Sequence, residues 1–352
     1  MNTFEYIRPT TIAEAVAAAS TPGAAYLAAG TNLVDLMKGG IVRPDRLVDV
    51  NHLPDLDQIE HRPDGGVRIG ALVRNADLAY DPAFSRRFPA VAEALLSGAS
   101  GQLRNAATVG GNLLQRTRCA YFYDPASACN KREPGAGCDA RGGDTRLHAV
   151  LGWSENCTAT HPSDFCVPLV ALDAVVEIEG RAGRREVKLE AFHRLPGAEP
   201  QRETVLEPGE LIVALRLPAE AAAFAAHARY LKIRERTSYA FAVVSAAAVL
   251  RIQGGIIADD RIALGGVAAK PWRARPAEAL LIGERPDQTA FRRTADAAMV
   301  DARPSGDNAF KIGLAHRIIV RTLALAAQGT PERLPALPAS PFASVPGAIT
   351  HA

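Results

Sequence analysis

The chain has 352 residues, of which 48% are hydrophobic and 22% are charged, and its net charge is +2. This balance is typical of a globular protein of two or three domains, and it predicts no basic surface for nucleic acid. Aromatic residues make up only 6% of the chain, too few for a platform on which bases stack. No apolar run is long enough to predict a membrane span, and the N-terminus lacks the pattern of an export signal.

The first 54 residues predict a small β-α-β-α-β unit. Thr11 and Glu14 form a capping box at the start of an alanine-rich helix. The next strand leads directly into Gly30-Thr31-Asn32, and residues 33–38 predict a second helix. Backbone N–H groups at a helix start, reached through a glycine, can bind phosphate. By itself this turn is equally typical of helices that bind nothing, and the G-x-G-x-x-G of a Rossmann fold is absent.

A second loop of the same kind follows in residues 55–115. Strand and helix patterns lead to the stretch ATVGGNL at residues 107–113. Gly110 and Gly111 permit close approach of the backbone, and Thr108 and Asn112 offer side-chain hydrogen bonds. Two separate loops of this type indicate a large nucleotide cofactor that lies between two subdomains.

All five cysteines lie between positions 119 and 166. Residues 116–158, which contain four of them, have neither the period of a strand nor that of a helix, so a bound metal would explain how this loop is held together. The spacing differs from the C-x2-C pairs of zinc ribbons and small ferredoxins, and leaves a [4Fe–4S] cluster, structural zinc and no metal all open. The nearby basic residues either are solvated or offset the charge of a cluster: Arg116, Arg118, Lys131 and Arg132.

Three further residues near the cysteines are given structural interpretations. Cys166, in front of an apolar helix, is predicted to be a small buried residue, with its use as a ligand in place of Cys157 as the alternative. His148 is expected to be a solvated loop residue. His161, before Pro162, is expected to be a turn residue.

Regular patterns return after the cysteine loop. Residues 174–180 and 184–189 predict a hairpin, and residues 211–217 predict a strand. A separate C-terminal domain is expected to contain three antiparallel strands with helices on one face. The strands are predicted at residues 226–233, 240–252 and 260–268, and the helices at residues 276–281, 289–299 and 308–327. From residue 330 onward a mobile tail or an extended arm is expected.

Five motifs together carry a family resemblance. They are LAAGTNL (27–33), ATVGGNL (107–113), HPSD (161–164), PGELI (208–212) and LGGVA (264–268). In this combination the chain resembles, over residues 1–328, the FAD-binding subunit of the xanthine dehydrogenase and molybdenum hydroxylase family. With its cysteine loop it is similar to the flavoprotein subunit of bacterial periplasmic aldehyde oxidoreductases, which carries an extra [4Fe–4S] cluster. The corresponding subunit of 4-hydroxybenzoyl-CoA reductase, which also carries one, is the alternative.

The resemblance implies an α+β protein: a two-subdomain FAD-binding fold of the vanillyl-alcohol-oxidase/molybdenum-hydroxylase type, plus a C-terminal domain of a three-stranded antiparallel sheet with helices. The implied divisions are an N-terminal FAD-binding subdomain (1–54), a central subdomain (55–220) with the iron–sulfur loop 116–158, a C-terminal domain (225–328) and a tail (330–352).

The resemblance also implies the cofactor-binding residues. The FAD pyrophosphate would lie on Ala28, Ala29, Gly30, Thr31, Asn32 and Leu33, and the preceding Leu27 would also contribute to cofactor binding. Thr108, Gly111 and Asn112 would hold its second side. Ser163 and Asp164 would bind near the ribityl chain or phosphate, Lys232 would lie near the flavin, and Ile212 completes the set. The cluster would be held by Cys119, Cys129, Cys138 and Cys157. Ala29 departs from the family, which usually has glycine there.

The implied function is electron transfer within an aldehyde-oxidising complex. A large molybdenum-cofactor subunit would oxidise the aldehyde, and a [2Fe–2S] small subunit would pass the electrons to FAD and on to an external acceptor. This chain would contribute no catalytic residue, and Tyr239 or Phe241 would either face the flavin or pack in the core. The complex would reach the periplasm through a partner with a twin-arginine signal, or stay in the cytoplasm. A stand-alone FAD-linked oxidase and a zinc-stabilised binding protein are the alternatives from other classes.

Overall fold

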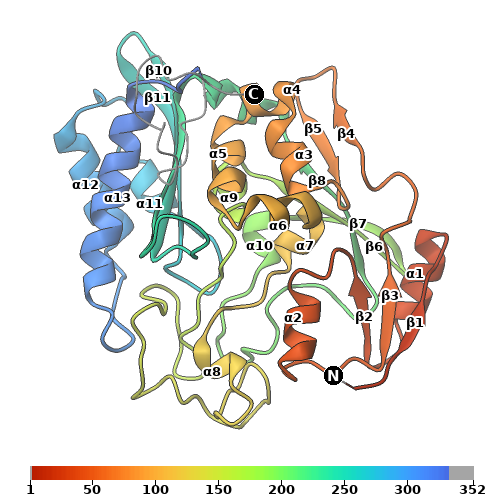
Figure 1. Ribbon diagram of the computed structural model, residues 1–352. Coiled ribbons are helices and arrows are strands. Elements are labelled where there is room, and N and C mark those ends of the chain that lie inside the picture. Colours follow the sequence, from red (N-terminus) through yellow and green to blue (C-terminus); the bar gives the residue numbers. More distant parts are fainter. Residues whose placement is uncertain (1, 333–352) are drawn as a thin grey trace.

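The computed structural model describes residues 2–332. Its first layer is a parallel three-stranded sheet of order β1-β3-β2 (Figure 1). The predicted capping box is confirmed at the start of the first helix, where the Thr11 hydroxyl accepts a hydrogen bond from the N–H of Glu14 at 3.2 Å. The predicted helix over residues 33–38 is also confirmed. The elements of this layer are β1 (Glu5–Ile7), α1 (Ile12–Ala19), β2 (Ala24–Leu27), α2 (Leu33–Lys38) and β3 (Arg46–Asp49).

The central layer is an antiparallel five-stranded sheet of order β4-β5-β8-β6-β7. The predicted hairpin over residues 174–189 is confirmed as β6 and β7, and its tight turn places Gly183 at a φ of +97°, a conformation that favours glycine. The strands are β4 (Ile59–His61), β5 (Val67–Gly70), β6 (Val175–Gly180), β7 (Gly183–Lys188) and β8 (Leu211–Leu217).

Several short helices accompany this sheet, and one more lies in the cysteine loop at residues 120–123. The stretch after residue 97, which the sequence patterns leave as a loop, contains two of them, α6 and α7. Each begins at a hydroxyl cap: Ser100 accepts from the N–H of Leu103, and Thr108 accepts from the N–H of Gly111. The helices are α3 (Asn75–Tyr80), α4 (Pro82–Arg87), α5 (Pro89–Ser97), α6 (Gly101–Ala106), α7 (Val109–Leu113), α8 (Ala120–Tyr123), α9 (Cys166–Ala171) and α10 (Leu189–Phe192).

The C-terminal layer is an antiparallel sheet of order β12-β11-β10-β9. The expected three strands are present, and the short β12 adds a fourth. Figure 1 shows α12 and α13 on the outer face of this sheet and α5 and α9 on its inner side. The elements are the 3-10 helix η1 (Ala219–His227), β9 (Ala228–Ile233), β10 (Val244–Gln253), β11 (Ile256–Gly265), β12 (Trp272–Arg273), α11 (Arg275–Glu278), α12 (Gln288–Ala298) and α13 (Phe310–Ala327).

Strand β10 explains how the central and C-terminal layers share a core. Its sequence is apolar at successive positions rather than alternating, as expected of a strand buried on both faces. Ala246 and Ala248 pack in the same cluster as the buried residues of α13. Ala247 and Val249, which point to the opposite face, belong to the cluster that includes the central sheet, α5 and α9. The C-terminal sheet is therefore covered by apolar side chains on both sides.

A buried ion pair joins the same two layers. Glu93 on α5 and Arg229 on β9 are 8% and 9% exposed, and their side chains meet at 2.9 Å. The carboxylate of Glu93 also accepts a hydrogen bond from the backbone N–H of Tyr230 at 2.7 Å. Because both charges are desolvated, each depends on the other for compensation.

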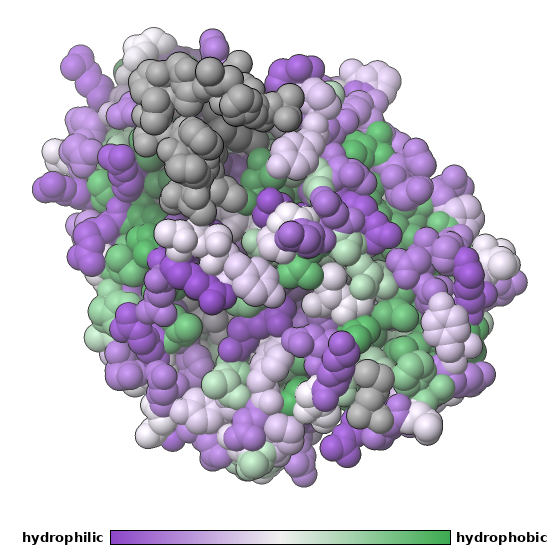
Figure 2. All heavy atoms as spheres, in the orientation of Figure 1, coloured by the Kyte–Doolittle hydropathy of each residue, from purple (hydrophilic) through white to green (hydrophobic). Residues whose placement is uncertain are grey.

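The outer surface is mixed. On the face in Figure 2, hydrophobic residues lie in small groups between hydrophilic ones. Within residues 2–332 no helix combines the length and apolar character needed to cross a membrane. The predicted tail lies almost entirely outside the described residues, which end at residue 332.

The Glu93–Arg229 pair gives a stability prediction. Glu93→Ala leaves the Arg229 guanidinium buried without its partner, so we expect the free energy of unfolding to fall by about 3–5 kcal/mol. Chemical denaturation measures this. Glu284→Ala is the matched control because it breaks an exposed pair with Arg293, and we expect a loss of about 1 kcal/mol or less. Equal losses in the two variants would contradict the role of burial.

Candidate functional site

The first candidate loop connects β2 to α2. Gly30 has a φ of +73°, and a Cβ there would stand 2.8 Å from the Val34 side chain, so the turn favours glycine. Among the described residues none accepts a hydrogen bond from the backbone N–H groups of Thr31, Asn32 and Leu33. The side-chain Nδ2 of Asn32 is likewise buried and unpartnered. This set of free donors at a helix start is suited to an anionic group.

The second loop leads into α7 and lies against the central sheet. The N–H of Gly110 donates to the carbonyl of Ala71 at 2.9 Å, and a Cβ on Gly110 would stand 2.9 Å from the Ala71 side chain and 3.0 Å from its carbonyl oxygen. Gly111, by contrast, is exposed. Glycine at 110 therefore lets α7 pack closely against Ala71, and glycine at 111 leaves the backbone on the outer side of α7 uncovered by a side chain.

The two loops meet at Asn32. Its Oδ1 accepts a hydrogen bond from the backbone N–H of Arg116 at 2.9 Å, three residues beyond the end of α7. At the other end of this region, the Asn112 side chain accepts from the hydroxyl of Ser163 at 2.7 Å. Three predicted segments, around residues 32, 108–112 and 163, are thereby brought into one neighbourhood.

Asp164 lies at the centre of a buried polar group that we call the Asp164 network: Asp164, Tyr230, Lys232 and the carbonyl of Ser97. The Tyr230 hydroxyl donates to Oδ1 of Asp164 at 2.5 Å, and the Lys232 ammonium donates to Oδ2 at 2.7 Å. Lys232 also donates to the Ser97 carbonyl at 3.2 Å. Burial, with Asp164 nearby, raises the pKa of Tyr230 well above its usual value, so its hydroxyl stays a donor.

The remaining predicted residues fall into two places. Leu27 ends β2, and Leu33 begins α2, so both flank the first loop. Ile212 lies on β8, where it is buried in the core and pairs in register with Ile178. No hydrogen bond in the described part of the chain connects Ile212 with the other predicted residues.

The cysteine loop, residues 116–158, brings its four thiols close together. Cys119, Cys129, Cys138 and Cys157 line one small cavity, although the chain between them is mostly turns. Cys129 and Cys138 face each other across an isolated antiparallel bridge. All five cysteines are free, and Cys166 is fully buried in α9, as predicted, away from this cavity.

These thiols are buried, but hydrogen-bond donors and one positive charge lie near them. Burial raises the pKa of Cys119 to about 12, although backbone N–H groups of Phe122 and Tyr121 oppose the shift. Burial also raises the pKa of Cys157, and the charge of Lys131 opposes it. Metal binding would displace the thiol protons, and N–H groups that point at sulfur are typical of iron–sulfur sites.

The end of the cysteine loop is fastened to α13 by a buried lysine. Lys311 donates hydrogen bonds to the carbonyls of Leu147, His148 and Gly266 at 3.1, 2.8 and 2.6 Å. Burial lowers the pKa of Lys311 to about 7. The prediction that His148 is solvated is wrong: it is 6% exposed, and its Nδ1 lies 2.9 Å from the Thr158 hydroxyl. The tertiary contact with α13, which the local sequence does not reveal, buries it.

Two residues of this region were not predicted from the sequence. In the sequence, Tyr230 looks like an ordinary buried residue of a strand, and only the tertiary fold brings its hydroxyl to Asp164. His193 directly follows α10, and its Nε2 donates to the carbonyl of Leu113 at 2.8 Å. No motif surrounds either residue, so the sequence contains no signal for them.

Comparison with known proteins identifies the family. The family described as "FAD binding domain in molybdopterin dehydrogenase" matches residues 2–220, and "CO dehydrogenase flavoprotein C-terminal domain" matches residues 229–326. The chain belongs to the FAD-binding subunits of the molybdenum hydroxylases. It is 50% identical to the aldehyde oxidoreductase FAD-binding subunit PaoB of Escherichia coli, over 92% of this chain and 98% of that protein.

Two carbon monoxide dehydrogenase comparisons agree with this assignment. The medium chain of the enzyme from Hydrogenophaga pseudoflava is 29% identical over 91% of this chain and 96% of that protein. A solved structure of carbon monoxide dehydrogenase from that organism matches with a TM-score of 0.72 and 30% identity, over 92% of this chain and 97% of that one. The α+β fold class predicted from the sequence is confirmed, and the chain is an FAD-dependent electron-transfer subunit of an oxidoreductase.

Gly110 gives a test of the second loop. Gly110→Ala places a methyl group against Ala71, so we expect α7 to shift and the dissociation constant for FAD to rise about tenfold or more, equivalent to about 1.4 kcal/mol or more. Fluorescence titration of the flavin-free chain with FAD measures it. Gly101→Ala is the control because a Cβ there meets nothing within 4 Å. If both variants bind FAD like the unmodified chain, the close approach has no bearing on the cofactor.

Proposed function

We propose that the chain is the FAD-binding electron-transfer subunit of a molybdenum-containing aldehyde oxidoreductase, in which a partner subunit oxidises aldehydes to carboxylic acids. The observation that carries this proposal is the 50% identity to the Escherichia coli aldehyde oxidoreductase subunit over nearly the full length of both proteins. The gathering of four cysteines around one cavity agrees with the periplasmic aldehyde oxidoreductase type that the sequence resembles.

The residues of the two loops fit the diphosphate of FAD. The unpartnered N–H groups of Thr31, Asn32 and Leu33 would donate to phosphate oxygens, together with the buried Nδ2 of Asn32. Thr108, Gly111 and Asn112 would bound the opposite side. The remaining loop residues, Leu27 to Gly30, would shape the turn. The methyl group of Ala29, where the family usually has glycine, would narrow the space for the phosphates.

The Asp164 network would hold the ribityl and flavin end. Ser163 is fixed by Asn112, and Asp164 is fixed by Tyr230 and Lys232, so these side chains are already oriented before a ligand arrives. Ile212, buried in the core, would act on the cofactor only through packing. When bound, FAD supplies the exchange between single-electron and two-electron transfer. The protein's part is to position it and to hold the charges around it.

We further propose that Cys119, Cys129, Cys138 and Cys157 hold a [4Fe–4S] cluster. Four converging thiols, backbone donors near the sulfurs of Cys119 and Cys157, and the Lys131 charge support this assignment. When bound, such a cluster can accept and pass on one electron at a time. Lys131, itself held by Glu203 at 2.8 Å and by the carbonyl of Pro200 at 2.9 Å, would offset part of its negative charge.

The proposed complex contains a large molybdenum-cofactor subunit, a [2Fe–2S] small subunit and this chain, and it delivers electrons to an external acceptor. The names of the relatives, which are subunits or medium chains, support an assembly of several subunits. The resemblance to the periplasmic enzymes supports export together with a twin-arginine-tagged partner. We propose the domain limits 1–54, 55–220 and 225–328 for the three layers, with residues 330–352 as a tail.

The aldehyde assignment is tested with the assembled complex. Anaerobic addition of an aromatic or aliphatic aldehyde to the three co-expressed subunits should bleach the flavin absorption band, with the carboxylic acid as product. Xanthine and carbon monoxide are the comparison substrates because related subunits serve those enzymes. Bleaching by xanthine or carbon monoxide without bleaching by any aldehyde would reject the aldehyde assignment and keep the family.

The cluster assignment predicts an iron count. Purified chain should contain about four irons and a matching amount of acid-labile sulfide. Cys119→Ser, Cys129→Ser, Cys138→Ser and Cys157→Ser should each lose most of this iron, because each removes a ligand. Cys166→Ser is the matched control and should keep it. Flavin-loaded protein that contains no iron would refute the cluster and leave the FAD assignment intact.

The Asp164 network predicts a defect in FAD binding. Asp164→Asn keeps the size of the side chain but removes a charged hydrogen-bond partner, which contributes about 1.5–3 kcal/mol in typical cases. We therefore expect the dissociation constant for FAD to rise about 10- to 150-fold. Asp77→Asn, which changes an exposed carboxylate of α3, is the control. An unchanged affinity in Asp164→Asn would remove Asp164 from the cofactor site.

A further inference from the structure

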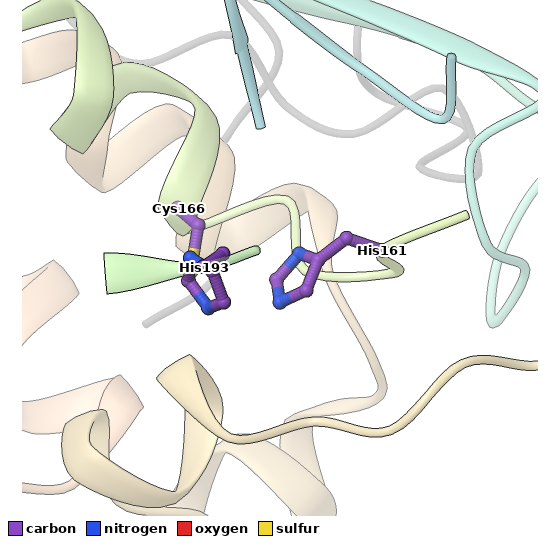
Figure 3. Close-up of side chains that lie close together, drawn as sticks. All are labelled: His161, Cys166 and His193. Carbon is purple, nitrogen blue, oxygen red and sulfur yellow. The ribbon is translucent and has the colours of Figure 1, made fainter. Parts of the chain in front are cut away.

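A second group of possible metal ligands lies apart from the four-cysteine cavity. It consists of His161, Cys166 and His193. One ring nitrogen of each histidine and the cysteine sulfur lie within 4.8 Å of one another. Figure 3 shows the His161 ring turned toward His193, with Cys166 reaching them from the start of α9. The three residues come from separate segments: the loop before α9, α9 itself and the position that directly follows α10.

The two imidazoles have buried nitrogens without the hydrogen-bond partners that buried polar groups need. Both ring nitrogens of His161 and the Nδ1 of His193 are buried and lack a hydrogen-bond partner in the described part of the chain. A buried polar atom that nothing binds has lost its hydrogen bonds to water without gaining any in their place. A ligand bound beside the Cys166 thiol would supply the partner that these three nitrogens lack.

The hydrogen bond of His193 orients it for ligation. Its Nε2 donates to the carbonyl of Leu113 at 2.8 Å, which places the proton on Nε2 and leaves the lone pair on Nδ1. A backbone carbonyl that fixes the tautomer in this way is typical of metal-binding histidines.

A cavity of about 250 Å³ reaches these imidazoles. Both His161 and His193 line it, together with Lys131, Gln201 and Glu203. An ion held by three protein ligands would thus have its fourth position directed to this space, where water could bind. Nitrogen and thiolate ligands in a set of three, with an open position, match the preferences of zinc.

We propose that His161, His193 and Cys166 bind one zinc-type divalent metal ion, separate from both the FAD loops and the four-cysteine cavity. On binding, the Cys166 thiol releases its proton to solvent and the sulfur becomes a thiolate ligand. Zinc–nitrogen and zinc–sulfur distances require ligand atoms about 3.3–3.6 Å apart. The two rings, whose centroids are now 4.3 Å apart at an interplanar angle of 58°, turn to meet the ion.

The site would stabilise the cofactor region. His161 and Cys166 flank Ser163 and Asp164, while His193 is tied to the last residue of α7 through the Leu113 carbonyl. A metal ion would therefore fix the segment that carries Asp164 to the end of the second loop. This role concerns stability and positioning, and it does not depend on the substrate of the complex.

Metal analysis tests the site. The purified chain, equilibrated with Zn²⁺ and dialysed, should retain about one zinc per chain beyond its iron. His161→Ala, His193→Ala and Cys166→Ala should each lose most of that zinc while their iron content stays near that of the unmodified chain. Cys119→Ser should show the reverse, with iron lost and zinc kept. Zinc that follows the iron in all variants would overturn the separate site.

Cobalt substitution decides the question without any change to the three proposed ligands. Chain loaded with Co²⁺ should show a thiolate-to-cobalt charge-transfer band and the visible bands of tetrahedral cobalt. A chain in which Cys119, Cys129, Cys138 and Cys157 are all replaced by Ser has Cys166 as its one remaining thiol, and it should keep both features. A flavin-loaded chain that takes up neither zinc nor cobalt beyond background would show that the two histidines form only a packed pair, and would refute the proposal.

Discussion

The pairing of the Asp164 carboxylate is the interaction on which the rest of the structure depends. Both oxygens of this buried group are taken, one by Tyr230 and one by Lys232, and both donors lie on β9 of the C-terminal sheet. Lys232 reaches on to the end of α5 through Ser97. A charge in this position is tolerated only because it is fully paired, so the carboxylate fixes how the C-terminal sheet sits against the central layer.

The Asp164 network also connects fold to function. Next to Asp164, the Ser163 hydroxyl holds Asn112 at the second loop, and Asn32 links the first loop to the chain just beyond α7. The cofactor loops are thus not isolated turns but parts of one hydrogen-bonded frame. An electron-transfer protein needs this rigidity because its contribution is to hold a cofactor at a fixed position relative to its donor and acceptor.

How much of this could be predicted from the sequence depends on the range of each contact. The Thr11 capping box, the α2 helix after Gly30 and the β6–β7 hairpin are local, and the sequence predicts them correctly. The convergence of the four thiols follows from their concentration in one loop, where a short stretch of chain can bring them together. Tyr230, His193 and the burial of His148 depend on partners that are far away in the chain, at Asp164, Leu113 and α13, and no local pattern encodes them.

A crystal structure of the cofactor-loaded chain, with anomalous scattering data collected at the iron absorption edge, tests the central claim most directly. The account predicts flavin density with its diphosphate between residues 28–33 and 108–112, its ribityl end beside Asp164, and an iron peak among Cys119, Cys129, Cys138 and Cys157. Flavin density that leaves Asp164 and both loops untouched, or iron bound away from these cysteines, would contradict it.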